Sequence, residues 1–188
     1  MQNRKFSVTR LVSIGLMAAL VFVTSKFLTI PIPAFAGVPT RIHLGNVMCI
    51  LSGLLFGGLS GGLSAGIGSM FMDLLDPIYI TSAPTTLINK FVMGFLAGKI
   101  SHSFGKNGTS TKVNIIAAIC GQFAYIILYL STTFISMSIQ GHDIHTIWVS
   151  VAEKGLVSSI NGIIAVAIAV PLAAVMRKAL KGTGVFAA

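Results

Sequence analysis

The run IHLGNVMCILSGLLFGGLSGGLSAGIGSMFM, residues 42–72, decides the fold. It contains no Asp, Glu, Lys or Arg, so it suits the interior of a membrane better than a water-facing surface. As one helix it would be roughly 45 Å long, which exceeds the ~30 Å apolar core of a bilayer. The GGLSGG segment at residues 57–62 is the natural place for a break. We therefore expect a hairpin of two short helices that pack closely through small residues at every fourth position.

The composition extends this membrane interpretation to the whole chain. Of the 188 residues, 54% are hydrophobic and only 9% are charged, whereas about 25% are charged in an ordinary soluble domain. This excludes a soluble globular enzyme, whose surface needs charge. The net charge of +9 does not indicate a nucleic-acid partner, because the basic residues are scattered between apolar runs and form no patch. Cys49 and Cys120 lie inside apolar runs and are expected to be packing residues.

The apolar runs predict an all-α fold, a single integral membrane bundle of six transmembrane helices that spans residues 1–188. The helices are expected at about residues 10–30, 42–56, 60–76, 85–101, 112–137 and 151–178. With six helices, nine of the 13 Lys and Arg residues share one side, which the positive-inside rule makes cytoplasmic: Arg4, Lys5, Arg10, Lys99, Lys106, Lys112, Arg177, Lys178 and Lys181. With five, the basic loop at residues 101–112 would be exported. We therefore expect a multi-pass plasma-membrane protein with both termini in the cytoplasm.

Polar residues recur toward the outer ends of three predicted helices. They are Asn89 and Lys90 on the fourth helix, Gln122, Tyr125 and Tyr129 on the fifth, and Lys154 and Asn161 on the sixth. Residues three or four apart share one face of a helix, so three polar faces converge. They predict a pocket for a small polar ligand that enters from outside. The alternative is that these residues form hydrogen bonds between helices. Arg41, just before the second helix, adds another costly charge at membrane depth.

No part of the sequence predicts catalysis. The nearest approach to a phosphate-binding loop is GFLAGKI at residues 94–100, which has the wrong spacing and lacks the hydroxyl residue. We therefore expect no ATP hydrolysis by this chain and no cofactor of its own. The segment from His142 to His145 contains two histidines and Asp143, which is a weak signal for a metal. No metal site is predicted.

Three stretches carry a resemblance to a known family: RIHLGNVMCILSGLLFG at residues 41–57, GIGSMFMDLLDP at residues 66–77 and TTLINK at residues 85–90. They are similar to the S-components, the substrate-binding subunits, of energy-coupling factor (ECF) vitamin transporters, most of all to the pantothenate-specific branch. The resemblance implies high-affinity capture of a vitamin from outside. It also implies three partners, a transmembrane coupling subunit and two cytoplasmic ATPase subunits, and these ATPases use the ATP.

The resemblance also implies a docking site on the first helix, where the family has a small-residue motif that contacts the coupling subunit. The segment from Gly15 to Ala19 has the spacing of that motif, with Gly in place of the first Ala. Gly15, Ala18 and Ala19 are therefore the expected docking residues.

Other ligands and another class of protein stay open. Neighbouring branches of the family take pyridoxine, hydroxymethylpyrimidine, riboflavin or folate. A stand-alone secondary transporter is the alternative from a different class, although the sequence has no evident inverted repeat or intramembrane ion site. Pantothenate is an anion, and its carboxylate would need a cation on leaving water. Lys90 is the first candidate, followed by Arg41 and Lys154, with Asn89, Tyr125 and Asn161 as partners for the neutral groups.

Overall fold

The computed structural model describes residues 7–34, 39–103 and 105–182. These residues form six α-helices, one two-stranded antiparallel sheet and a short 3₁₀ helix. The elements in chain order are α1 (Val8–Phe27), β1 (Thr29–Ile32), β2 (Thr40–His43), α2 (Gly45–Phe56), α3 (Gly58–Leu74), η1 (Ile80–Ser82), α4 (Ala83–Ser101), α5 (Thr111–Ile139) and α6 (Ile144–Ala179). The prediction of a six-helix bundle is confirmed.

The break in the long apolar run falls at Gly57, where it was expected. Gly57 has φ +82°, a left-handed conformation that glycine adopts without steric cost. Its amide donates a 2.9 Å hydrogen bond to the Gly53 carbonyl and so closes the last turn of α2. The short α2 and the following α3 therefore form the predicted hairpin.

Glycines bring α2, α3 and α4 together backbone to backbone. A Cβ added to Gly61 would overlap the Cα of Gly53, and one added to Gly94 would lie 2.5 Å from the Gly61 carbonyl oxygen. At Gly98 the added Cβ would lie 2.5 Å from the Gly57 carbonyl oxygen. The prediction that the small residues serve close helix packing is confirmed. Around this junction lies a core that includes Ile50, Leu54 and Met93.

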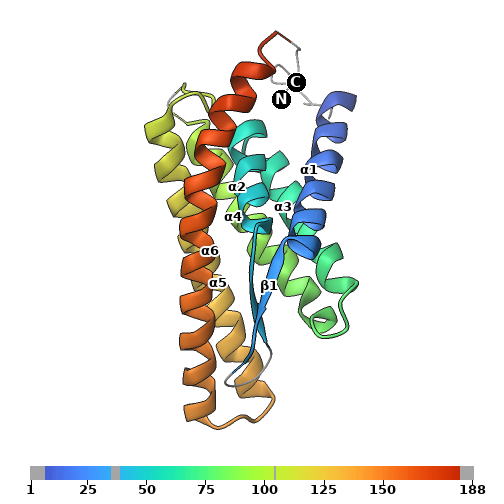
Figure 1. The fold of residues 1–188 in the computed structure, drawn as a ribbon, viewed down its shortest axis with the longest axis vertical. Helices are drawn as coiled ribbons and strands as arrows, with labels where there is room; N and C mark the ends of the chain where they lie inside the picture. The colour runs from blue at the N-terminus through green and yellow to red at the C-terminus, as the bar shows by residue number, and fades with distance from the viewer. Residues whose placement is uncertain (1–6, 35–38, 104, 183–188) are drawn as a thin grey trace, which may run out of the picture.

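The bundle has two unlike ends (Figure 1). The start of α1 and the end of α6 lie at one end, here called the terminal end. At the other, the distal end, α5 and α6 continue well beyond α2, α3 and α4 to the turn that joins them. With 36 residues, α6 is about 54 Å long, longer than a bilayer core is thick. The start of α1 and the end of α6 lie at the same end of the bundle, which agrees with an even number of membrane crossings. The cytoplasmic location of that end stays a prediction from the charges.

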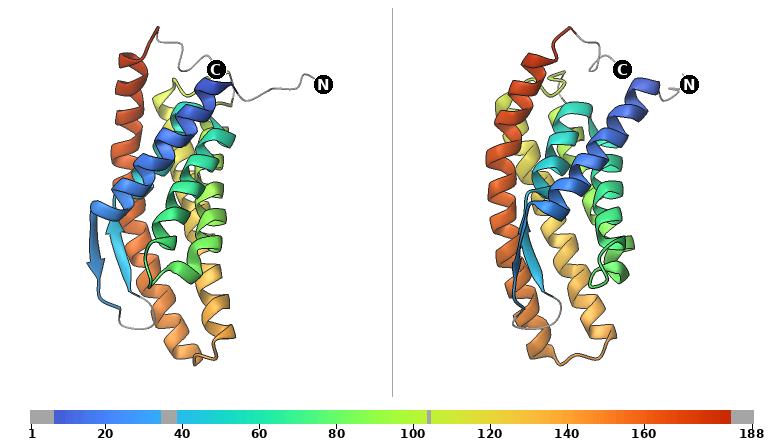
Figure 2. Two further views of the ribbon diagram at one scale, coloured as in Figure 1. Left: turned by 90° about the vertical axis from the view of Figure 1, so that its right-hand side faces the viewer. Right: turned by 45° about the vertical axis from the view of Figure 1, so that its right-hand side comes forward.

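The β1–β2 hairpin differs from the sequence prediction, which placed a loop here and began the second helix at residue 42. Thr29 pairs with His43, and Ile32 pairs with Thr40. Both strands are edge strands, so Pro31 can occupy β1 without removing a sheet hydrogen bond from a central strand. The hairpin lies along the distal half of α6, as both views of Figure 2 show. It closes one side of the space between the helices.

The start of α6 also differs, at Ile144 rather than about residue 151. Asp143 is the N-cap: its Oδ1 accepts hydrogen bonds from the backbone amides of His145, at 3.0 Å, and Thr146, at 3.1 Å. These bonds extend the helix into a segment that its polar residues had suggested to be a loop. Among the residues that the structure describes, three helices are long and apolar enough to cross a membrane, judged by length and composition alone: α1, α5 and α6. Their outward faces carry exposed apolar side chains such as Leu16, Phe123 and Ile163.

Candidate functional site

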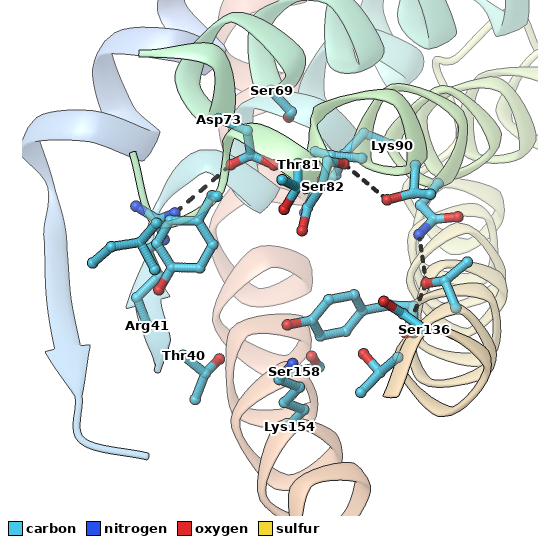
Figure 3. Close-up of a pocket in the computed structure, with 18 of the residues that line it drawn as sticks. Thr40, Arg41, Ser69, Asp73, Thr81, Ser82, Lys90, Ser136, Lys154 and Ser158 are labelled. Atoms are coloured by element: carbon cyan, nitrogen blue, oxygen red, sulfur yellow. Dashed lines mark hydrogen bonds and ion pairs between the residues drawn. The ribbon is translucent and has the colours of Figure 1, made fainter. Parts of the chain in front are cut away.

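A polar cavity lies in the distal half of the bundle (Figure 3). Its volume is about 320 Å³, and residues from β2, α3, η1, α4, α5 and α6 line it. Hydroxyl groups dominate the lining; the residues that provide them include Thr40, Ser69, Thr81, Ser82, Thr85, Thr86, Thr132, Thr133, Ser136 and Ser158. In the close-up, Thr40, Ser136, Ser158 and Lys154 lie across the open space from Asp73, Thr81, Ser82 and Lys90.

The structure brings together seven of the eight residues that the sequence proposed for ligand binding. Arg41, Asn89, Lys90, Tyr125, Tyr129, Lys154 and Asn161 line the cavity. Gln122 is the exception, because it is not among the described residues that form the lining. Whether these side chains bind a ligand stays a prediction. Their convergence from three helices and a strand is an observation.

Lys90 projects from α4 into the interior and is only 4% exposed. Its ammonium donates a hydrogen bond to the Asn46 side-chain oxygen and lies 3.8 Å from the centre of the Tyr125 ring. Within the described part of the chain, no carboxylate forms an ion pair with it. Lys90 is therefore a buried cation at the wall of a polar cavity, and the two groups that contact it directly, an amide oxygen and an aromatic ring, are neutral. The adjacent Asn89 donates a 3.4 Å hydrogen bond to Thr132.

Gln122 lies one helical turn deeper than the tyrosines of its face and joins other helices instead of lining the cavity. Its Oε1 accepts a 3.3 Å hydrogen bond from Asn46, and its Nε2 donates to the backbone carbonyl of Ser158, also at 3.3 Å. For Gln122, the alternative of interhelical hydrogen bonding therefore describes the structure. Asn46 was not predicted as a partner, although a polar amide inside an otherwise apolar helix is a signal for such a contact.

Arg41 has partners that neutralise its charge. Its guanidinium forms ion pairs with Asp73, at 3.7 Å, and Asp76, at 3.4 Å. It also lies 3.7 Å from the centre of the Tyr79 ring, while the Tyr79 hydroxyl donates a 2.7 Å hydrogen bond to the Pro39 carbonyl. Burial raises the pKa of the Tyr79 hydroxyl, which favours the protonated donor. This cluster connects the hairpin with the segment between α3 and α4, and none of its acidic or tyrosine members was predicted.

Asn161 holds the hairpin on α6. Its Oδ1 accepts a 3.0 Å hydrogen bond from the His43 amide, and its Nδ2 donates at 2.9 Å to the Arg41 carbonyl. Both ends of the side-chain amide are thus engaged with β2. The residue lines the cavity, but its hydrogen bonds in this structure are structural.

The remaining predicted ligand residues surround an aromatic pair. The rings of Tyr125 and Tyr129 stack with centroids 5.6 Å apart and an interplanar angle of 7°. Lys154 approaches from α6, with its ammonium 5.8 Å from the centre of the Tyr129 ring. Together with Lys90, which lies across the open space from Lys154, these residues bring two cations and two aromatic rings to the cavity.

The structure divides the three residues proposed for partner docking. Gly15 and Ala19 are exposed on α1, and a Cβ added to Gly15 would meet nothing within 4 Å. Ala18 is buried, because its carbonyl oxygen packs against Gly68 of α3. Ala18 therefore faces the interior of the bundle in this structure, which does not favour its expected role in docking. The outward pair stays a prediction.

Near the distal turn, Asp143 acts as the helix cap described above. No group of three or more His, Cys, Asp or Glu residues suited to a metal ion occurs among the residues that the structure describes.

Comparison with known proteins agrees with this fold. Residues 5–178 match the family model described as "ECF-type riboflavin transporter, S component". Among solved structures, the chain is similar to one described as "Structure and mechanism of the S component of a bacterial ECF transporter". The TM-score is 0.62 and the identity 22%, over 92% of this chain and 97% of that one. No curated protein matches the sequence.

Proposed function

Since the chain belongs to the family of ECF-type riboflavin transporter S components, we propose that it captures pantothenate, a small anionic vitamin, from outside the cell. Members of this family are transporter subunits in the plasma membrane and not enzymes. The coarser part of the assignment, a vitamin-binding S component, follows from the family. The identity of the vitamin is the proposal.

The observation that carries the proposal is that the buried ammonium of Lys90 forms no ion pair with a carboxylate of the described residues. A buried ammonium without a carboxylate partner has lost its hydration and gains little in return. An anionic ligand in the cavity would supply the missing charge and a strong, charge-assisted hydrogen bond. Arg41 is a weaker candidate than its charge suggests, because Asp73 and Asp76 already pair with it.

The rest of the cavity suits the neutral groups of such a ligand. Pantothenate carries two hydroxyls and an amide, and hydroxyl side chains such as Thr86 and Ser136 line the cavity. A volume of about 320 Å³ lies at the small end of the roughly 300–1,000 Å³ range of ligand pockets. A compact polar vitamin fits this description better than a large apolar one.

Riboflavin is the second candidate, and two observations favour it. The matching family model is named for riboflavin transport. The stacked Tyr125 and Tyr129 rings also provide aromatic surface beside the cavity, which could receive a flat ring system. Riboflavin is uncharged, so this candidate leaves the buried charge of Lys90 without a role in binding.

For the transport cycle we propose the family's division of labour. The ligand binds in the distal half and the segments around the cavity close over it. The bundle then docks through the outward face of α1 on a transmembrane coupling subunit, and two ATPase subunits supply the energy for release inside. The exposed Gly15 and Ala19 support this role of α1, because small residues allow close approach of a partner helix.

Calorimetry on the purified chain tests the ligand. We expect pantothenate to bind and riboflavin, pyridoxine and hydroxymethylpyrimidine to give no heat at the same concentrations. Mass spectrometry of any vitamin that copurifies from the host provides an independent reading. Binding of riboflavin but not pantothenate would overturn the proposal in favour of the second candidate.

A further inference from the structure

Three buried side chains form a line of hydrogen bonds behind the cavity. Lys90 donates to Asn46, Asn46 donates to Gln122, and Gln122 donates to the backbone carbonyl of Ser158. The line crosses from α4 through α2 and α5 to α6. Asn46, Lys90 and Gln122 are 1%, 4% and 5% exposed, so all three side chains lie in the interior of the bundle.

The direction of the line is fixed at its far end. A backbone carbonyl can only accept, so the Nε2 of Gln122 must face Ser158 and its Oε1 must face Asn46. Asn46 therefore presents its NH₂ group to Gln122. Its oxygen is left for the ammonium of Lys90.

We propose that Asn46 and Gln122 are positioning residues that give the cavity its preference for an anion. The Asn46 oxygen is an acceptor without net charge, so it holds the Lys90 ammonium in place while the positive charge stays available to a ligand. A carboxylate at the same point would hold the ammonium equally well and cancel its charge. This inference rests on the proposed function, because it presumes that the ligand is an anion.

The surroundings of Lys90 fit this role. Asp73 lines the same cavity but forms an ion pair with Arg41. Tyr125 supports the ammonium with the face of its ring, at 3.8 Å from the centroid, which also leaves the charge in place. The groups that contact Lys90 directly thus orient it without neutralising it, whereas Asp73 acts on it only through space.

The first test compares two ligands that differ in charge: pantothenate, and panthenol, in which a hydroxymethyl group replaces the carboxylate. For Asn46→Asp we expect the affinity for pantothenate to fall by about thirtyfold or more, as for a charged partner lost from a buried pair. The affinity for panthenol should stay within about threefold, by the same argument. Ser138→Asp, at an exposed position of α5 that is not among the lining residues, is the control for added negative charge and should leave both affinities unchanged. Equal losses for both ligands would mean that Asn46 only packs the helices, and would overturn the proposal.

A second variant keeps the test decisive if Asn46→Asp does not fold. Gln122→Met removes the acceptor that orients Asn46 while keeping an unbranched side chain of similar length. Without this acceptor nothing fixes the orientation of the Asn46 amide, so its oxygen no longer stays on the Lys90 ammonium, and we expect a selective loss for pantothenate in this variant as well. An unchanged ratio of the two affinities would contradict the proposal.

A third measurement does not depend on the vitamin. Glyoxylate condenses with a neutral lysine amine to form an imine and water, and cyanoborohydride then delivers a hydride to give carboxymethyl-lysine, which mass spectrometry locates. In Asn46→Asp the ratio of labelling at Lys90 to labelling at Lys154 should fall severalfold, because the carboxylate holds the amine protonated and repels the anionic aldehyde. In Gln122→Met the ratio should rise, because the ammonium loses its acceptor. These opposite shifts would show that Asn46 and Gln122 position the Lys90 ammonium, whichever vitamin the chain binds. Unchanged ratios would overturn the inference.

Discussion

Residues of like charge have different surroundings in this cavity. Arg41 lies between two carboxylates and a tyrosine ring, whereas Lys90 contacts an amide oxygen and a ring. In sequence both are basic residues at the edge of apolar runs. The distinction arises because folding brings Asp73 and Asp76, more than 30 positions away, next to Arg41. These surroundings support the proposal that Lys90 binds the ligand, and they predict a structural role for Arg41.

This distinction predicts the effects of two matched substitutions. Lys90→Gln should weaken pantothenate binding by roughly 2–4 kcal/mol, the cost of leaving a buried ligand carboxylate without its cation. Arg41→Gln should chiefly lower the thermal midpoint of the protein, because Asp73 and Asp76 lose their shared partner. Calorimetry and thermal unfolding in detergent measure both effects, with Lys106→Gln at an exposed site as the control. Equal pantothenate affinities of Lys90→Gln and the unmodified protein would contradict the assignment.

Helical spacing predicted much of the cavity, and its errors have physical causes. Tyr125 and Tyr129 share a face and line the cavity as expected. Gln122 shares that face, but one turn deeper the neighbouring helices come close enough to take up its amide. Asn161 likewise meets the hairpin, an element that the sequence did not predict. Periodicity gives the face of a helix and not the depth at which a cavity ends.

Among the secondary-structure elements, the length and apolarity of the sequence runs predicted the helices but did not predict the β1–β2 hairpin. The strand TIPI contains a proline and has only four residues, so it has no useful period and its proline suggests a loop. The glycine-rich hairpin of α2 and α3 was predictable because an unbroken helix would exceed the bilayer. The sequence did not predict that α4 packs against this hairpin, where Gly94 and Gly98 of α4 meet the backbone of Gly61 and Gly57.

The glycine junction predicts a contrast between two Gly→Ala substitutions. In a helix this change gains about 1 kcal/mol of intrinsic propensity. Gly98→Ala should nevertheless destabilise the protein by about 1–3 kcal/mol, because its Cβ would meet the Gly57 backbone at 2.5 Å, which no rotamer can relieve. Gly15→Ala meets nothing within 4 Å and should leave the thermal midpoint unchanged or slightly higher. A rise in the midpoint for both variants would show that α2 and α4 do not pack at this distance.

The N-cap of α6 predicts a dependence on pH. Hydrogen bonds from Thr146 hold the pKa of the Asp143 carboxyl below its usual range. A depressed pKa in the folded state gives stability that is present above the unfolded pKa of ~3.9 and lost as the pH falls through the folded value. Asp143→Ala should therefore lower the thermal midpoint at neutral pH, and the difference from the unmodified protein should narrow below about pH 4. Asp143→Asn keeps a capping oxygen and should show a small difference without this narrowing.

The whole molecule is asymmetric along its long axis, and this asymmetry separates the two proposed sites. The residues that line the cavity come from the hairpin strand β2, from η1 and from α3 to α6, and none of the lining residues belongs to the first half of α1. In Figures 1 and 2, α1 runs from the terminal end toward the middle of the bundle. A ligand and a partner subunit can therefore contact different faces of the bundle.

The membrane orientation follows from the charges and can be measured directly. Single cysteines placed beside Asp143 should react with a membrane-impermeant thiol reagent added to intact cells, and cysteines beside Asn107 should react only after permeabilisation. The background is Cys120→Ser, because Cys120 is exposed on α5 whereas Cys49 is buried. The reverse labelling pattern would place the terminal end outside, and with it the cavity mouth on the cytoplasmic side.

Docking on α1 is tested by two neighbouring alanines that face opposite ways. Ala19 is exposed beside Gly15, so Ala19→Trp should block close approach of a partner helix, prevent assembly with the coupling subunit and abolish vitamin uptake. It should leave vitamin binding by the isolated chain intact. Ala18 packs on Gly68 of α3, so Ala18→Trp should disrupt the bundle itself and reduce binding and thermal stability together. Copurification with the coupling subunit, calorimetry and an uptake assay separate the two effects. If Ala19→Trp also lost vitamin binding, the outward face of α1 would be required for the fold, and the coupling subunit would have to dock elsewhere.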